Sequence, residues 1–278
     1  MWGIVARLLV VSRPRFWLYL AGPVLVGVAY GAPDVAALTA PLAVALFGYF
    51  LVPANVFLYG INDIYDADID VENPKKAGRE RRFRGDSVTV AAVLASAALG
   101  GALLVVSPPV ARPYLLGFLV LGWAYSAPPL RLKTTPPLDS IVNGLYILPG
   151  AAAYAVVAGT HPPGLAVLGG WVWAMGMHTF SAIPDIDPDR RAGIDTTATV
   201  LGGPMTLAYC ALAWSVAAAV FGVLDWRAGV LLAVYPGLVG VVGWRSIPVD
   251  DAYWWFPAIN TIVGAAITIP GLWWVVHG

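Results

Sequence analysis

The stretch that decides the fold is PLAVALFGYFLVPANVFLYGINDIYDADID, residues 41–70. Its first part is almost entirely apolar and is long enough for a membrane-spanning helix, which needs roughly 20 such residues. The apolar run then leads directly into a cluster of one amide and several carboxylates. An apolar helix that ends in acids indicates a membrane protein with a polar site at one membrane face.

The composition of the whole chain also indicates a membrane protein. Of its 278 residues, 59% are hydrophobic and 12% are charged, whereas soluble domains usually carry about 25% charged residues. The 16 basic residues are balanced by 16 acidic ones, so no excess of positive charge favours nucleic acid as a partner. The single cysteine, Cys210, excludes a disulfide framework and a cysteine metal cluster.

Further windows like the first predict an all-α, polytopic membrane protein with nine transmembrane helices in one bundle and cytoplasmic catalytic loops. We expect residues 1–278 to form a single domain. The windows are separated by proline, glycine or charge. They lie at about 16–32, 39–62, 87–107, 110–126, 138–159, 163–183, 203–223, 227–243 and 253–276.

The distribution of charge predicts the orientation of these helices. With nine helices and a cytoplasmic N-terminus, Arg112 and Arg227 are the only basic residues outside, as the positive-inside rule requires. Among the acids, only Asp34 and Asp225 lie outside. We therefore predict an integral protein of the cell membrane, with the N-terminus and the active site cytoplasmic and the C-terminus outside.

The first acidic segment, NDIYDADID at residues 62–70, predicts a magnesium site. If the helix continues, Asn55, Asn62, Asp66 and Asp70 recur along one face at spacings of seven, four and four. Carboxylates this close repel one another unless a cation lies between them, and Mg²⁺ binds one or two carboxylates together with phosphate oxygens. A solvated acidic loop is the alternative, which the adjoining apolar helix disfavours.

A second acidic segment, PDIDPDRRAGID at residues 184–195, places Asp185 and Asp189 four residues apart at the same predicted face. We predict that the two segments share one diphosphate through Mg²⁺. Their short similarity also suggests two related halves of the bundle. The alternative is a polar loop created by the helix-breaking residues Pro184 and Pro188.

The loop YSAPPLRLK at residues 125–133 supplies further groups for a diphosphate, namely Tyr125, Arg131 and Lys133. Arginine offers a fork of donors and lysine a point charge, and both suit phosphate oxygens. A topology signal explains these charges equally well. The amides of Asn55 and Asn143 are candidates to bind substrate, with hydrogen bonding between helices as an equal alternative.

On these residues the chain resembles the UbiA superfamily of intramembrane prenyltransferases. Its two signatures, NDxxDxxxD and DxxxD, are matched in full. The resemblance implies a helical bundle with a lateral opening to lipid, in which Mg²⁺ and an allylic diphosphate lie beneath cytoplasmic loops. It implies catalytic and metal-binding roles for Asn62, Asp66, Asp70, Asp185 and Asp189, and phosphate contacts for Tyr125 and Lys133.

Within that superfamily, HTFSAIPDIDPDRRAGIDTTATVLG at residues 178–202 is most similar to the lycopene elongases. This resemblance implies transfer of a dimethylallyl group from dimethylallyl diphosphate to lycopene, or to another acyclic carotene, drawn from membrane lipid. Members with aromatic, quinone-precursor or glycerol-ether acceptors share the metal chemistry, so those acceptors stay open. A transporter is the rival class, but it usually has ionisable groups at mid-membrane, and the predicted spans have none there.

Overall fold

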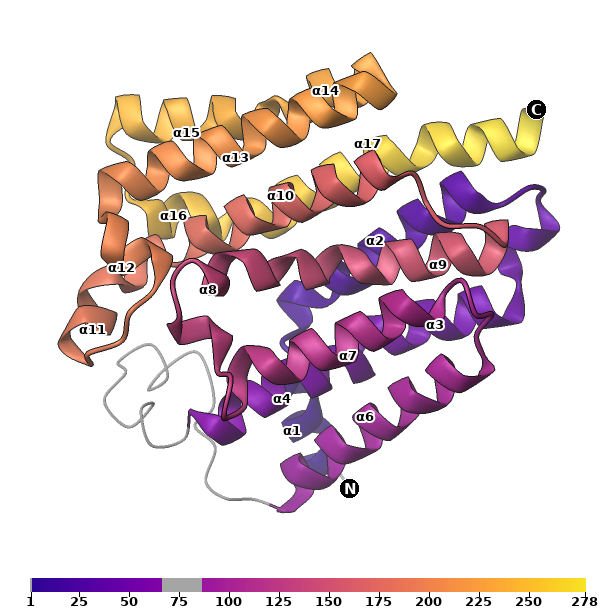
Figure 1. Ribbon diagram of the computed structural model, residues 1–278, viewed down its shortest axis with the longest axis horizontal. Helices are drawn as coiled ribbons and strands as arrows, with labels where there is room; N and C mark the ends of the chain where they lie inside the picture. The colour runs from indigo at the N-terminus through magenta and orange to yellow at the C-terminus, as the bar shows by residue number, and fades with distance from the viewer. Residues whose placement is uncertain (1, 67–86) are drawn as a thin grey trace. The chain divides into compact units, whose positions relative to one another are not determined.

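The computed structural model describes residues 2–66 and 87–278, which form helices joined by turns, without a strand (Figure 1). Asp70 and the basic run at 75–84 lie outside the described residues. The chain divides into two compact units. Unit 1 comprises Met1–Arg131, Leu148–His161 and Gly271–Gly278, and unit 2 comprises Leu132–Ile147 and Pro162–Pro270.

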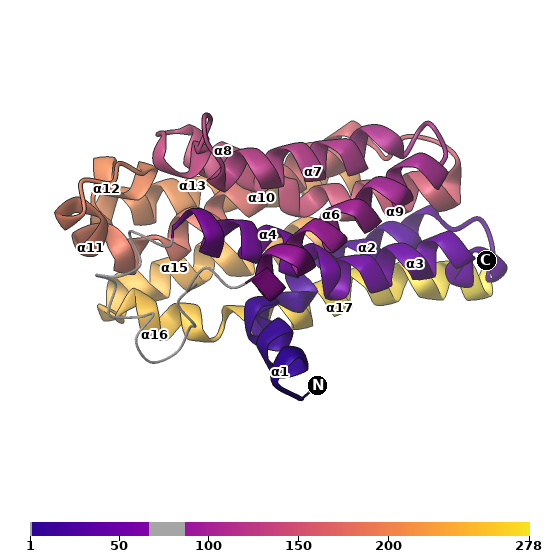
Figure 2. The same cartoon turned by 90° about the horizontal axis from the view of Figure 1, so that it is seen from below.

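Unit 1 contains α1 (Trp2–Val11), α2 (Trp17–Gly31), α3 (Pro41–Leu51), α4 (Pro53–Tyr65), α6 (Ser87–Val106), α7 (Arg112–Ser126) and α9 (Leu148–Ala158). Helix α1 was not predicted, and Figure 2 shows it projecting from the other helices of this unit. Helices α2 and α9 pack with their backbones in contact. A Cβ atom added to Gly27 would lie 2.1 Å from the carbonyl oxygen of Gly150, so the approach requires glycine.

The predicted span at 39–62 consists of two helices. Helix α3 ends at Leu51 and α4 begins at Pro53, because proline has no backbone N–H to continue the first helix. The Nδ2 group of Asn55 donates to the carbonyl oxygens of Phe50 and Leu51, both at 3.0 Å. This buried amide therefore satisfies carbonyl groups at the end of α3.

Unit 2 contains α8, α10 to α16 and most of α17, with a buried aromatic core. The rings of Trp214 and Phe256 are stacked with their centroids 5.8 Å apart, and Phe180 and Tyr235 pack beside them. The helices are α8 (Leu138–Ile141), α10 (Gly164–Ser181), α11 (Ile186–Arg191), α12 (Thr197–Leu201), α13 (Gly203–Leu224), α14 (Trp226–Leu232), α15 (Val234–Arg245), α16 (Val249–Trp254) and α17 (Phe256–His277).

Each of the nine predicted windows is helical, and the all-helical membrane fold is confirmed. Among the described residues, six helical stretches are long and apolar enough to cross a membrane. Of the other windows, α2 and α7 have 15 residues each and α10 has 18. The number nine and the orientation of the termini stay predictions. The six stretches are Pro41–Tyr65, Ser87–Val106, Leu138–Ala158, Gly203–Leu224, Trp226–Arg245 and Phe256–His277.

Candidate active site

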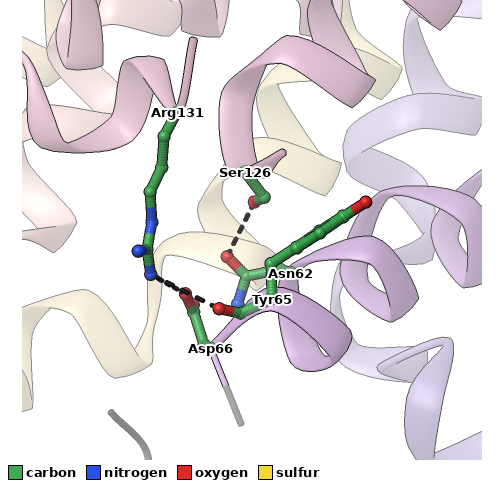
Figure 3. Close-up of polar contacts among 5 residues, drawn as sticks. All are labelled: Asn62, Tyr65, Asp66, Ser126 and Arg131. Carbon is green, nitrogen blue, oxygen red and sulfur yellow. Dashed lines mark hydrogen bonds and ion pairs between the residues drawn. The ribbon is translucent and has the colours of Figure 1, made fainter. Parts of the chain in front are cut away.

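The end of α4 carries the start of the first acidic segment, residues 62–66, and is bound by side chains from the end of α7 and the loop that follows. Ser126 Oγ donates to Asn62 Oδ1 at 3.1 Å. Arg131 Nη2 donates to Asp66 Oδ1 at 3.0 Å and to the carbonyl oxygen of Tyr65 at 3.4 Å (Figure 3). The structure therefore brings together three predicted site residues, Asn62, Asp66 and Arg131.

The backbone of the loop directs Arg131 toward α4. The backbone dihedral φ of Arg131 is 40°, in the left-handed region that residues other than glycine rarely adopt. Its N–H donates to the carbonyl oxygen of Ala127 at 3.0 Å, which closes the turn. The side chains of Arg131 and Asp66 are 31% and 13% exposed. A guanidinium presents its N–H donors as a fork, a geometry that suits the oxygens of a diphosphate.

A second arginine binds the same end of α4 and was missed in the sequence. Arg13 Nη2 donates to Asp63 Oδ1 at 3.2 Å, and the Arg13 guanidinium lies 4.6 Å from the centroid of the Tyr59 ring. The Asp63 side chain is only 9% exposed, and a carboxylate this buried requires a charged or hydrogen-bonded partner. The pair attaches α4 to the turn between α1 and α2.

The second acidic segment lies in unit 2. Asp185 directly precedes α11, Asp189 lies within that helix, and both are half-buried. Helix α12 follows and begins with a capping box. The Thr196 hydroxyl accepts the N–H of Thr199 at 3.1 Å, and the Thr199 hydroxyl accepts the N–H of Thr196 at 2.8 Å.

The remaining predicted residues lie in both units. Tyr125 is half-buried in α7, next to Ser126, whereas Lys133 is half-buried in a 3₁₀ turn of unit 2. Asn143 is buried, and its amide donates to the backbone carbonyl of Asp139. The roles predicted for Tyr125, Lys133 and Asn143 stay predictions, as does the sharing of one diphosphate by the two acidic segments.

The residues present at the end of α4 fit a magnesium ion. Within residues 2–66 and 87–278, no three or more His, Cys, Asp or Glu side chains are grouped to hold a metal, and Asp70 lies outside that range. Asn62 and Asp66 offer an amide and a carboxylate oxygen, both hard donors. Mg²⁺ requires only one or two carboxylates when phosphate oxygens and water complete its shell, so this donor set suits Mg²⁺ that binds together with a diphosphate.

Solved structures share this fold over nearly the whole chain. A UbiA homologue from Archaeoglobus fulgidus, bound to DMAPP and Mg²⁺, matches with a TM-score of 0.71 and 20% identity over 95% of this chain and 98% of that one. The apo structure of a UbiA homologue from Aeropyrum pernix K1 matches with a TM-score of 0.72 and 23% identity, over 93% and 98% of the two chains. Both show that the all-helical fold is shared over nearly the whole chain.

The sequence agrees with the fold. Residues 20–255 match the model of the UbiA prenyltransferase family, so the chain belongs to this family and is a prenyltransferase. It is 60% identical to the lycopene elongase/hydratase of Halobacterium salinarum over 98% of both chains. It is also 60% identical to that of Haloferax volcanii, over 98% of this chain and 90% of the relative.

Proposed function

We propose that this prenyltransferase transfers the dimethylallyl group of dimethylallyl diphosphate to a terminal double bond of lycopene or a closely related acyclic carotene. The observation that carries the proposal is the 60% identity to lycopene elongase/hydratases along almost the whole chain. The site of unit 1 is consistent with it, because the Arg131 cation and the Asp66 carboxylate lie together at the end of an apolar helix.

In this proposal the polar residues bind and activate the donor. Asn62, Asp66 and Asp70 of one segment, with Asp185 and Asp189 of the other, would hold the Mg²⁺ that binds together with the diphosphate. The metal, when bound, supplies positive charge that stabilises the departing diphosphate. Tyr125, Arg131 and Lys133 bind its oxygens directly, and the fork of Arg131 suits two of them at once.

The acceptor enters from the bilayer in this proposal. The C–O bond of the donor breaks, and an electron pair from the terminal double bond of the carotene forms the new C–C bond. The resulting tertiary cation then either loses a proton to give an alkene or adds water, which loses a proton to leave a hydroxyl group. Asn55 and Asn143 are candidates to bind substrate in this proposal, and in the structure each donates its amide to a nearby backbone carbonyl.

Expression in a bacterium that makes lycopene tests the proposal. The wild-type protein should give carotenoids heavier by one and then two five-carbon units, with an added hydroxyl where water ends the reaction. The control is the Asp189→Asn variant, with its amount in the membrane verified, which should leave lycopene unchanged. An unchanged carotenoid profile with wild-type protein, while the same membranes prenylate an aromatic acid or an isoprenoid glycerol, would show that the acceptor is wrong.

A further inference from the structure

Contacts made by neighbouring residues hold the second acidic segment in place, and the first of them comes from Asp139 in α8. Its Oδ2 accepts the backbone N–H of Thr197 at 2.8 Å, and its Oδ1 accepts the Thr197 hydroxyl. Asp139 is 2% exposed, so water competes little for these bonds. A buried carboxylate of α8 therefore fixes the first turn of α12.

Arg190, the residue after Asp189, connects α12 to α11. Its Nε and Nη2 groups donate to the carbonyl oxygen of Thr199 at 3.2 and 2.6 Å. The N–H of Ile194 donates to the carbonyl oxygen of Asp189 at 2.9 Å, so the chain turns back directly after α11. Hydrogen bonds thus run from α8 through α12 to the helix that carries Asp189.

Helix α8 is itself anchored to the longer helices of unit 2. Ser140 Oγ lies 2.7 Å from Thr179 Oγ1 of α10 and 2.8 Å from the Tyr209 hydroxyl of α13. Figure 1 shows α11 and α12 at the end of unit 2 where α8 lies, α10 ends and α13 begins. The helix that carries Asp139 is therefore held by α10 and α13. The segment that Asp139 contacts, α11 and α12, lies beyond the long helices.

We propose that Asp139 is a positioning residue for the second acidic segment. By fixing α12, and through Arg190 also α11, it arranges Asp185 and Asp189 to receive Mg²⁺ and diphosphate before either binds. This inference rests on the function proposed above for those two carboxylates. Removing an outer partner of a metal ligand typically lowers metal affinity about 10- to 100-fold. We expect about tenfold for Asp139, because it acts through several bonds.

The test compares purified Asp139→Asn with Asp225→Asn, a matched control in the same unit. Asp225 also binds the first turn of a short helix, since its Oδ1 accepts the N–H of Arg227 at 2.9 Å at the start of α14. Within unit 2, α14 lies at the opposite end from α11 (Figure 1). Each variant therefore replaces a carboxylate that accepts the N–H of a first-turn residue of a short helix, one beside the acidic segment and one far from it.

Two measurements are made on each protein in lipid nanodiscs. Hydrogen–deuterium exchange over residues 185–201 should be faster in Asp139→Asn and unchanged in Asp225→Asn. The Mg²⁺ concentration that half-saturates binding of dimethylallyl diphosphate should rise about tenfold in Asp139→Asn only. Thr197→Val, which loses one donor, should give an intermediate effect, and Thr197→Ser, which keeps both donors, should match the wild type.

Unchanged exchange over residues 185–201 in Asp139→Asn overturns the proposal, and so does faster exchange with an unchanged Mg²⁺ requirement. If Asp139→Asn does not fold, the comparison of Thr197→Val with Thr197→Ser decides by the same two measurements. If the wild-type protein does not bind dimethylallyl diphosphate with Mg²⁺, the proposed function fails. The exchange data then still decide whether Asp139 positions the segment.

Discussion

The two acidic segments are held in place by different kinds of contact. In the first, arginine side chains bind the acids themselves, Arg131 on Asp66 and Arg13 on Asp63. In the second, Asp139 and Arg190 bind backbone groups of α12, which follows the acids. Substitution of the arginines at the first segment therefore changes the charge around its acids. Substitution of Asp139 or Arg190 instead changes where the acids of the second segment lie.

If the two acidic segments bind one diphosphate, both must lie at the same membrane face. Cysteine labelling tests this with an all-or-none result. In a Cys210→Ala background, Leu130→Cys and Arg191→Cys mark the two segments, and Thr160→Cys marks the face that is predicted to lie opposite. From the positive-inside rule, we expect a membrane-impermeant thiol reagent to label only Thr160→Cys on intact cells. Labelling of Leu130→Cys without Arg191→Cys contradicts a shared face.

Removing one carboxylate from either segment should have the largest graded effect. Asp66→Asn and Asp189→Asn should each lower the rate of dimethylallyl transfer about 10²- to 10³-fold, because charge stabilisation by a metal amounts to several kcal/mol. Rates in isolated membranes at several Mg²⁺ concentrations measure this. Asp34→Asn is the control, because Asp34 is an exposed cap on the N–H of Ala37. If either Asp66→Asn or Asp189→Asn retains half of the wild-type rate, that residue is not a metal ligand.

Arg131 should have a smaller effect that depends on Asp66. Arg131→Gln should lower kcat/KM for dimethylallyl diphosphate about 10- to 100-fold, because hydrogen bonds to charged groups contribute about 1.5–3 kcal/mol. The loss should be smaller in a protein that already carries Asp66→Asn, since paired residues are not additive. Arg112→Gln is the control, as its guanidinium binds backbone carbonyls. Strict additivity of the Asp66 and Arg131 effects argues against a functional ion pair.

The smallest effect is expected from Ser126. Its uncharged hydroxyl contacts Asn62, a predicted metal ligand. Ser126→Ala removes the bond to Asn62 and should lower kcat/KM about two- to tenfold, the equivalent of one neutral hydrogen bond. Ser215→Ala removes a hydroxyl that donates to the Ala211 carbonyl of its own helix, and should leave the rate unchanged. A loss as large as that of Asp66→Asn assigns Ser126 a direct part in the reaction.

The helices and the acidic segments were predictable from sequence because both depend on residues close together in the chain. Apolar runs predicted all nine helical windows. The signatures identified Asn62, Asp66, Asp185 and Asp189 as candidates, whose roles stay predictions. The break between α3 and α4 had a visible signal in Pro53. The threonine pair of the α12 capping box, Thr196 and Thr199, was a second local signal.

The contacts that fix the site were not predictable because they join distant parts of the chain. Arg13 binds Asp63 across 50 residues, and Asp139 binds Thr197 across 58. Spacing along a helix predicts neighbours three or four residues away, but it does not identify partners from other helices. The positive-inside rule also accounted for the charge of Arg13, so its ion pair had no separate signal.

Unit 1 is built from segments that are far apart in the chain, and this has a consequence for synthesis of the protein. Its segments include α2 and also Gly271–Gly278, with all of unit 2 encoded between them. A Cβ atom on Gly271 would lie 3.1 Å from the Tyr30 ring and 3.2 Å from Ala29, so this turn of α17 rests directly on α2. Domains usually fold as units while the ribosome is still translating, N-terminal units first. Here α2 lacks one of its neighbours until translation has passed Gly271, so unit 1 is completed only after all of unit 2 has been synthesised.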